Sequence, residues 1–95
     1  MNPVQVNTEK NRFELELNGS IAFMAFQKIE PNILDLTHTE VPEELSGKGV
    51  GSKLVIGVLQ YCKDNNLQII PSCSFVKSYI DNHPEWNFLV AQRKS

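Results

Sequence analysis

The first third of the chain alternates apolar and polar residues on both sides of one dipeptide, Asn18-Gly19. In residues 11–31 the alternating apolar series is Phe13, Leu15 and Leu17 before the dipeptide, and it resumes after it as Ile21, Phe23, Ala25 and so on. Asn-Gly between two alternating runs is the strongest local signal for a tight β-hairpin. We therefore predict two antiparallel strands joined by a two-residue turn, with a further short strand at residues 4–6.

The stretch NILDLTHTEVP continues this alternation, and we expect it to form another strand that ends at Pro42. Uninterrupted alternation would place two sets of side chains on opposite faces of the strand. One face would carry Leu34, Leu36, His38 and Glu40. The other would carry Ile33, Asp35, Thr37, Thr39 and Val41.

From Gly49 to about Asn65 the apolar spacing changes to three and four residues, which predicts an amphipathic helix. The apolar LQIIP segment that follows is typical of a short strand in parallel pairing. A second helix, SFVKSYIDNH, would be capped by Ser72 or Ser74 and stopped by Pro84, after which EWNFLV packs back. This order predicts an α+β protein or a mixed three-layer sandwich, with a mostly antiparallel sheet, one strand-helix-strand crossover and a C-terminal helix.

Composition limits the other possibilities. Ninety-five residues with 41% hydrophobic and 21% charged side chains fit a single globular domain, residues 1–95. A net charge of −2 with scattered lysines and arginines disfavours nucleic-acid binding. We expect no membrane span and, because the N-terminal residues lack an apolar signal core, a cytoplasmic location. Cys62 and Cys73 show no disulfide or zinc-site spacing, so no metal is expected.

Three glycines, Gly47, Gly49 and Gly51, precede the first predicted helix. A Walker A loop is excluded because Gly49 follows Gly47-Lys48 and Pro42 occupies a required glycine position. A dinucleotide-binding fingerprint is excluded as well, since it needs glycine at position 52 or 54. Two interpretations remain: the helix N-terminus receives an anion such as a pyrophosphate, or the glycines only form a turn into the helix.

The loop SGKGVGSKL after HTEVP resembles the acetyl-CoA loop of the GNAT superfamily of N-acetyltransferases. The family pattern is Gln or Arg, two residues, Gly, one residue, and Gly or Ala. Its glycines match Gly49 and Gly51, whereas its first position falls on Ser46 and departs from the pattern. The chain also contains the segments Cys-x-Phe-Val-x-x-Tyr-Ile and His-Pro-Glu. With these it resembles the small single-domain GNAT-like proteins, and the resemblance extends from about Arg12 to Trp86.

This resemblance implies acetyl-CoA or CoA as ligand, with its pyrophosphate on backbone N–H groups of about Gly47 to Ser52 and its pantetheine between the HTEVP and LQIIP strands. Ser46 stands where the family has Gln or Arg, so one contribution that the family makes to this loop is affected. The backbone N–H groups that would hold the pyrophosphate are not affected. The binding residues that the resemblance implies are Val41, Pro42, Ser46, Gly47, Lys48, Gly49, Val50, Gly51, Ser52, Cys73, Phe75 and Tyr79.

Acetyl transfer to an amine needs a base, and often an acid for the departing thiolate. His38 and Glu40 are the candidate bases, although a strand histidine is often only a satisfied polar residue and Glu40 can be surface charge. Cys73, at a strand end before a helix, is an acyl carrier or an acid in one interpretation and a small buried hydrophobe in the other. Tyr79 is the second candidate acid or a core aromatic. Cys62 is assigned to the core.

The sequence thus predicts an acetyl-CoA-dependent N-acetyltransferase that acts on a primary amine of unknown identity. Backbone amides near Val41 would polarise the thioester carbonyl. The acceptor would be a small molecule or a protein, and the enzyme a monomer or weak homodimer. The alternative is a CoA-binding sensor or interaction module without efficient catalysis, because the chain lacks most of the material that shapes the acceptor pocket in larger GNAT domains.

Overall fold

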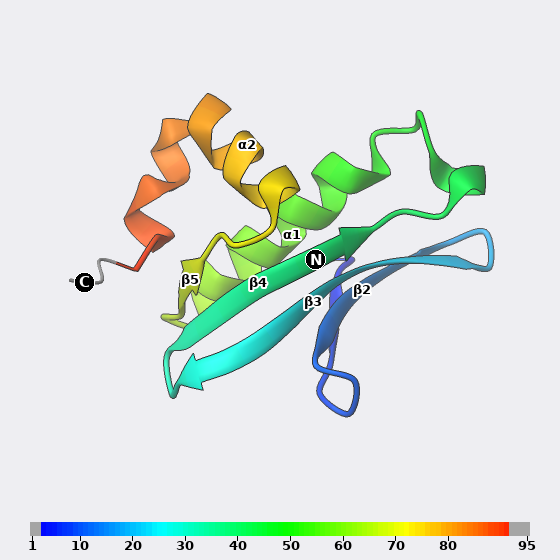
Figure 1. Ribbon diagram of the computed structural model, residues 1–95. Coiled ribbons are helices and arrows are strands. Elements are labelled where there is room, and N and C mark those ends of the chain that lie inside the picture. The colour runs from blue at the N-terminus through cyan, green and yellow to red at the C-terminus, as the bar shows by residue number, and fades with distance from the viewer. Residues whose placement is uncertain (1–2, 92–95) are drawn as a thin grey trace.

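A computed structural model describes residues 3–91 as one five-stranded sheet with two helices against it (Figure 1). Short 3-10 helices η1 and η2 lie in the connections. The elements in chain order are β1 (Gln5–Asn7), β2 (Arg12–Leu17), β3 (Ser20–Glu30), β4 (Ile33–Glu40), η1 (Glu43–Leu45), α1 (Val50–Asp64), β5 (Gln68–Ile70), α2 (Ser74–Asn82) and η2 (Pro84–Leu89).

The strands lie in the sheet in sequence order, β1-β2-β3-β4-β5. The first four are antiparallel, and β5 pairs with β4 in parallel after the α1 crossover. The hairpin at Asn18-Gly19 is confirmed, because both residues have the positive φ angles, 54° and 82°, that a tight two-residue turn requires. The predicted α+β class and the parallel pairing of LQIIP are therefore correct.

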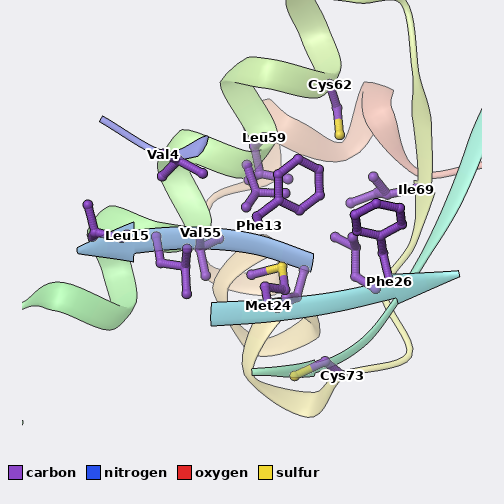
Figure 2. Close-up of a cluster of buried hydrophobic side chains, with 14 of the residues drawn as sticks. Val4, Phe13, Leu15, Met24, Phe26, Val55, Leu59, Cys62, Ile69 and Cys73 are labelled. Atoms are coloured by element: carbon purple, nitrogen blue, oxygen red, sulfur yellow. The ribbon is translucent and has the colours of Figure 1, made fainter. Parts of the chain in front are cut away.

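Both helices lie on the same side of the sheet (Figure 1), so within residues 3–91 the third layer of a sandwich is not present. The buried side chains form one cluster between the helices and the strands. Figure 2 shows Phe13 close to Leu59 of α1 and Phe26 close to Ile69 of β5. This cluster is apolar throughout: no polar or charged residue among residues 3–91 is buried.

One prediction about β4 is wrong. Ala25 pairs with His38 but Phe26 pairs with Leu36, so Thr37 is an extra residue that forms a β-bulge. A bulge reverses the alternation beyond it. Consequently Leu34 and Leu36 are buried against the helices, whereas His38 and Glu40 are exposed on the opposite face of the sheet.

The cap of α2 also differs from the prediction. Neither Ser72 nor Ser74 is the N-cap residue; Cys73 occupies that position, and the helix begins at Ser74. The first helix matches its prediction closely, with Gly49 as N-cap and Asn65 as C-cap, followed by Asn66 in a left-handed conformation (φ 57°). The terminal segment packs back as expected: Leu89 is buried and Val90 forms a parallel bridge with Ile69.

Candidate functional site

The glycine loop connects the end of β4 to α1 and is held in place at two points. Leu45 of η1 is buried (2% exposed), which anchors the start of the loop in the core. Ser20 Oγ, at the tip of the β2–β3 hairpin, donates a 2.7 Å hydrogen bond to Glu44 Oε2. This bond, together with the backbone of η1, lowers the pKa of the Glu44 carboxyl group below its ordinary value. The loop therefore starts from a defined position.

The three glycines have two different roles. Gly47 and Gly49 have φ angles of 78° and 71°, in the left-handed region that other residues adopt only at a cost. Gly51 has ordinary helical backbone geometry, but a Cβ atom there would lie 2.8 Å from Cζ of Phe75. A Cβ atom at position 51 would thus require the exposed Phe75 ring, which packs on the first turn of α1, to shift. Two glycines shape the loop, and the third joins α1 to α2.

A hollow of about 300 Å³ opens between this loop and α2. The unpaired N–H groups of the first turn of α1 and the positive end of its dipole are the features that attract an anion to a helix N-terminus. Eight of the twelve predicted binding residues line this hollow. They are Val41, Ser46, Gly47, Gly49, Val50, Gly51, Ser52 and Phe75.

Four predicted binding residues do not line the hollow: Pro42, Lys48, Cys73 and Tyr79. Sequence analysis in turn missed Leu45, which does line it. The signal was available, because Leu45 is the only apolar residue between Pro42 and Val50 in a polar, glycine-rich segment. A single apolar residue in such a segment indicates an anchor to the core.

Cys73 lies where β4 and α2 approach each other. Its backbone N–H donates to Leu36 O (2.8 Å), and its sulfur is 3.2 Å from Thr39 Oγ1. Burial opposes ionisation of the thiol, but the Thr39 hydroxyl and the backbone amides of Val76 and Phe75 outweigh it. The pKa of Cys73 is therefore lower than that of an ordinary cysteine. The thiol is 9% exposed, so its surface is small.

Cys62 has the opposite environment. It lies on α1 inside the apolar cluster, on the other side of that cluster from Cys73 (Figure 2). Desolvation raises the pKa of its thiol to about 12. A thiol that stays protonated and fully buried is unreactive. The assignment of Cys62 to the core is confirmed.

The bulge at Thr37 separates the candidate base from the thiol. Thr39 is on the same face of β4 as Leu36 and contacts Cys73, whereas His38 is on the opposite face. His38 Nε2 and Glu40 Oε2 are 3.8 Å apart, and both side chains are about 60% exposed. The ring of Phe23 lies beside His38, with centroids 6.2 Å apart. The imidazole and the thiol thus lie on opposite sides of one strand.

The far end of β4 has an open edge. Towards β5, β4 is paired only from Ile33 to Asp35, and Leu36 makes one further bond, to Cys73. Towards β3, the pairing continues to Glu40. In the described part of the chain, the edge of β4 beyond Leu36 therefore faces the hollow and the start of α2 without a strand beside it.

Tyr79 lies at the other end of α2 from Cys73. Its ring stacks on His83, with centroids 4.0 Å apart and planes 15° apart. Nδ1 of His83 lies 2.8 Å from Tyr79 O, and His83 is the C-cap residue of the helix. These contacts give Tyr79 and His83 a structural role at the helix end. An additional role of the Tyr79 phenol as an acid stays a prediction.

Comparison with known proteins agrees with this arrangement. A family model for the GCN5-related N-acetyltransferases matches residues 12–89. The chain belongs to this family. Protein NATD1 of Gallus gallus is 29% identical over 86 residues, which cover 86% of this chain and 78% of NATD1. Protein NATD1 of Homo sapiens is 28% identical over 86 residues, which cover 86% of this chain and 76% of that protein.

A solved structure extends the likeness to nearly the whole chain. The NMR solution structure of a GCN5-like candidate N-acetyltransferase from Staphylococcus aureus superposes with a TM-score of 0.69 at 29% identity. The match covers 99% of this chain and 94% of that one. The resemblance inferred from the HTEVP strand and the glycine loop is thus confirmed at the level of family and fold, and an acyl-transfer function follows from it in general terms.

Two further features bear on this member of the GCN5-related family. Within residues 3–91, no helix is both long and apolar enough to pass through a bilayer. The same residues contain no group of three or more His, Cys, Asp or Glu side chains that could bind a metal ion.

Proposed function

We propose that this protein binds acetyl-CoA and transfers the acetyl group to a primary amine. The observation that carries the proposal is the convergence of three features: the N-terminus of α1, the N-cap Cys73 of α2, and the open edge of β4. The N-terminus of α1 attracts phosphate groups, and Cys73 provides a thiol with a lowered pKa. The open edge of β4 leaves backbone N–H groups that can donate to a carbonyl oxygen. The family membership makes acetyl-CoA the expected ligand.

In this proposal the pyrophosphate is held by N–H groups from Gly47 to Ser52, with Phe75 as a wall of the site. The pantetheine extends along the open edge of β4 towards Cys73. Backbone amides near Val41 polarise the thioester carbonyl. Lys48 is exposed, so it can add a charge contact to phosphate only from the solvent side.

The acceptor amine approaches from the face of the sheet that carries His38 and Glu40. One of these side chains removes a proton from the ammonium, directly or through water, so that the neutral nitrogen attacks the carbonyl carbon. The C–N bond forms, the C–S bond breaks, and the attacking nitrogen loses its second proton to water, which leaves a neutral amide. The CoA thiolate takes a proton from Cys73 or Tyr79. The deprotonated acid and the protonated base then return to their initial states by exchange with water.

A two-step route uses the same groups. The Cys73 thiolate attacks the thioester carbon, forms S-acetyl-Cys73 and releases CoA thiolate, which takes up a proton. The neutral amine then attacks S-acetyl-Cys73, the Cys73 thiolate leaves, and the nitrogen loses a proton to water. The lowered pKa of Cys73 favours this route. The position of His38 on the opposite face of β4 favours direct transfer, because the imidazole and the thiol do not form a catalytic pair.

A second candidate function is a CoA-binding module without efficient catalysis. The observation that favours it is the exposure of His38 and Glu40, whose 3.8 Å separation is too long for a hydrogen bond. Within residues 3–91 no side-chain hydrogen bond holds His38 or Glu40 in one orientation, and His38 has only the Phe23 ring beside it. CoA binding without acetyl loss over a panel of amines would support this module and contradict the enzyme.

One sample tests both functions. We would record thermal melting and intact mass of the protein with and without acetyl-CoA. Ligand at about a hundred times its Kd should add roughly 2.7 kcal/mol of stability. A raised melting temperature with an acetyl adduct that Cys73→Ala abolishes would support the two-step route. A raised melting temperature without the adduct leaves direct transfer or the binding module, which the amine panel separates. No shift at saturating ligand would contradict acetyl-CoA binding.

A further inference from the structure

A second hollow lies at the other end of α1, away from the glycine loop. It has a volume of about 430 Å³, within the range of small-molecule sites. It is lined by residues from the last turn of α1, by β3, and by the turn between β1 and β2. The 15 residues of α1 separate it from Gly49 by roughly 20 Å along the helix axis. It is therefore distinct from the candidate acyl-transfer site.

The inner wall of this hollow is aromatic. Phe13 is the central ring: its centroid is 5.1 Å from that of Phe26 and 5.3 Å from that of Tyr61, in tilted and edge-on orientations. Leu34 and Leu67 add aliphatic surface to the same wall. Rings arranged in this way accept a further ring in an edge-to-face contact. The wall thus suits a planar apolar group.

The rim is polar and carries one charge. Thr8, Asn11, Lys28 and Asn65 contribute to it, and no acidic residue lines the hollow. Lys28 follows Ala22, Met24 and Phe26 in the row of β3 side chains that faces the helices, so it lies where the next core residue would be. None of the ion pairs found within residues 3–91 includes Lys28. The C-terminal end of α1 carries partial negative charge, which disfavours an anion beside it, so Lys28 is the group at this rim that attracts a negative charge.

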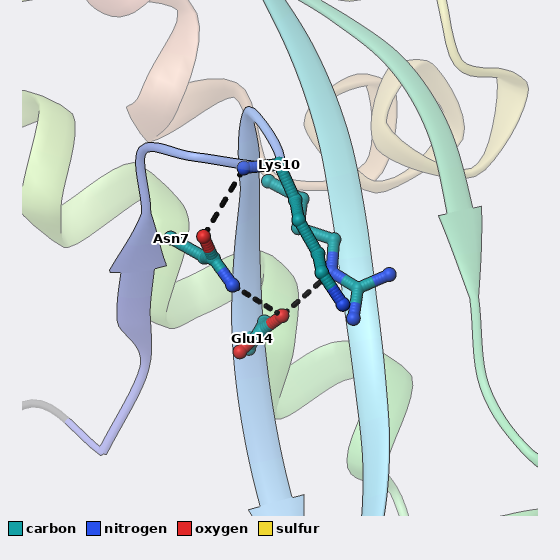
Figure 3. A network of polar contacts seen from close by, with 4 residues as sticks. Asn7, Lys10 and Glu14 are labelled. Carbon is teal, nitrogen blue, oxygen red and sulfur yellow. Dashed lines mark hydrogen bonds and ion pairs between the residues drawn. The ribbon is translucent and has the colours of Figure 1, made fainter.

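The mouth of the hollow is preformed. Asn11 has a left-handed backbone (φ 52°), and its carbonyl accepts a 2.9 Å hydrogen bond from the N–H of Phe26. The turn before it is held by Asn7, whose Oδ1 accepts from the N–H of Lys10 (3.1 Å) and whose Nδ2 donates to Glu14 Oε2 (3.2 Å) (Figure 3). A ligand would therefore enter without ordering a loop, which favours binding.

We propose that this hollow, the aromatic pocket, binds a small molecule that has one aromatic ring and a carboxylate. The ring lies against Tyr61 and the exposed part of Phe26, with the buried Phe13 behind them. The carboxylate accepts hydrogen bonds from Lys28 and from the amide of Asn11 at the rim. This site is independent of acyl transfer, so it does not depend on the function proposed above.

The test uses the whole ¹⁵N-labelled chain and two matched probes, 4-phenylbutyrate and the neutral 4-phenylbutan-1-ol. We expect saturable amide shifts for phenylbutyrate at Val6, Thr8 and Leu67, and none at residues 46–52. Phenylbutanol should bind about three- to tenfold more weakly, because it lacks the charge that Lys28 contacts. Lys28→Gln should weaken the binding of phenylbutyrate by the same factor and leave the binding of phenylbutanol unchanged.

Two variants complete the experiment. Lys53→Gln, at an exposed lysine in the first turn of α1, is the control and should change neither affinity. Thr8→Phe places a ring at the exposed rim and should block both probes without disturbing the core. Absence of shifts at millimolar phenylbutyrate, shifts centred on residues 46–52, or equal affinity of the acid and the alcohol would each overturn the proposal. Retained binding in Thr8→Phe would overturn the location.

Discussion

Thr39 Oγ1 lies 3.2 Å from Cys73 Sγ, and this contact joins the far end of β4 to the N-terminus of α2. The two residues are 34 positions apart in the chain, and the bulge at Thr37 places Thr39 on the face where the contact is possible. The Thr39 hydroxyl is also the largest of the influences that lower the pKa of Cys73. The reactivity of the thiol is therefore set partly by β4.

Thr39→Val should make Cys73 less reactive. The variant keeps the shape of the side chain but removes the hydroxyl that stabilises the thiolate, so the pKa of Cys73 should rise. The rate of alkylation by iodoacetamide, measured at Cys73 by peptide mass spectrometry, should move to higher pH. Thr37→Val is the matched control, because the Thr37 hydroxyl bonds to Ala25 O and not to the thiol. An unchanged rate–pH profile in Thr39→Val would contradict this account.

The same pKa shift has a consequence for stability. Because the folded-state pKa of Cys73 is depressed, its thiolate contributes stability at pH values above the unfolded-state pKa of the thiol. That contribution is lost as the pH falls through the folded-state pKa. Thr39→Val should therefore lose stability relative to the wild type mainly above the folded-state pKa, and urea denaturation across this pH interval would measure the difference.

Gly51→Ala should reveal the contact with Phe75. In the wild type, the gain in helix propensity is opposed by the need to displace the Phe75 ring, so we expect little net change in the free energy of unfolding. In a Phe75→Ala background there is no ring to displace, so Gly51→Ala should raise the free energy of unfolding by about 0.5–1 kcal/mol. Urea denaturation of the four proteins measures the coupling. Equal effects in both backgrounds would exclude Phe75 as the reason for this glycine.

Leu45→Ala should destabilise the protein by about 2–5 kcal/mol, because it removes a buried side chain that anchors the glycine loop. Urea denaturation gives the loss. Ile56→Ala removes another aliphatic side chain, but from a residue of α1 that is 43% exposed, and should cost much less. A similar loss in the two variants would mean that Leu45 is not a specific anchor. If Leu45→Ala still folds, weaker binding of acetyl-CoA by this variant would show that the anchored position of the loop matters for binding.

His38→Gln should lower the rate of acetyl transfer at least about 100-fold, as the loss of a general base does, with the melting temperature unchanged because the side chain is exposed. Steady-state kinetics with a responsive amine would measure the loss. His83→Gln is the control, since it makes the same chemical change at the C-cap of α2. Unchanged turnover in His38→Gln would remove this residue from the mechanism and leave Glu40 as the candidate base.

Much of the architecture could be predicted because its signals are local. Asn18-Gly19, the three- and four-residue spacing after Gly49, and Pro84 each determine the backbone over a few residues, and the observed elements agree with them. The position of the glycine loop before α1 was predictable for the same reason. The face carrying His38 was not, because alternation has no signal for an inserted residue, and the bulge at Thr37 depends on how β3 and β4 pair.

The sequence by itself therefore determined the fold class and the loop at the start of α1, since local backbone preferences and periodic apolar positions specify them, and its motifs identified the family by resemblance. Only the tertiary structure decided which groups meet. It brings Thr39 to Cys73, packs Phe75 on Gly51, places His38 on the opposite face from the thiol, and assembles Phe13, Phe26 and Tyr61 into the wall of a second pocket. The physical reason is that these contacts depend on strand register and on helix packing between segments far apart in the chain, and no short stretch of sequence encodes either.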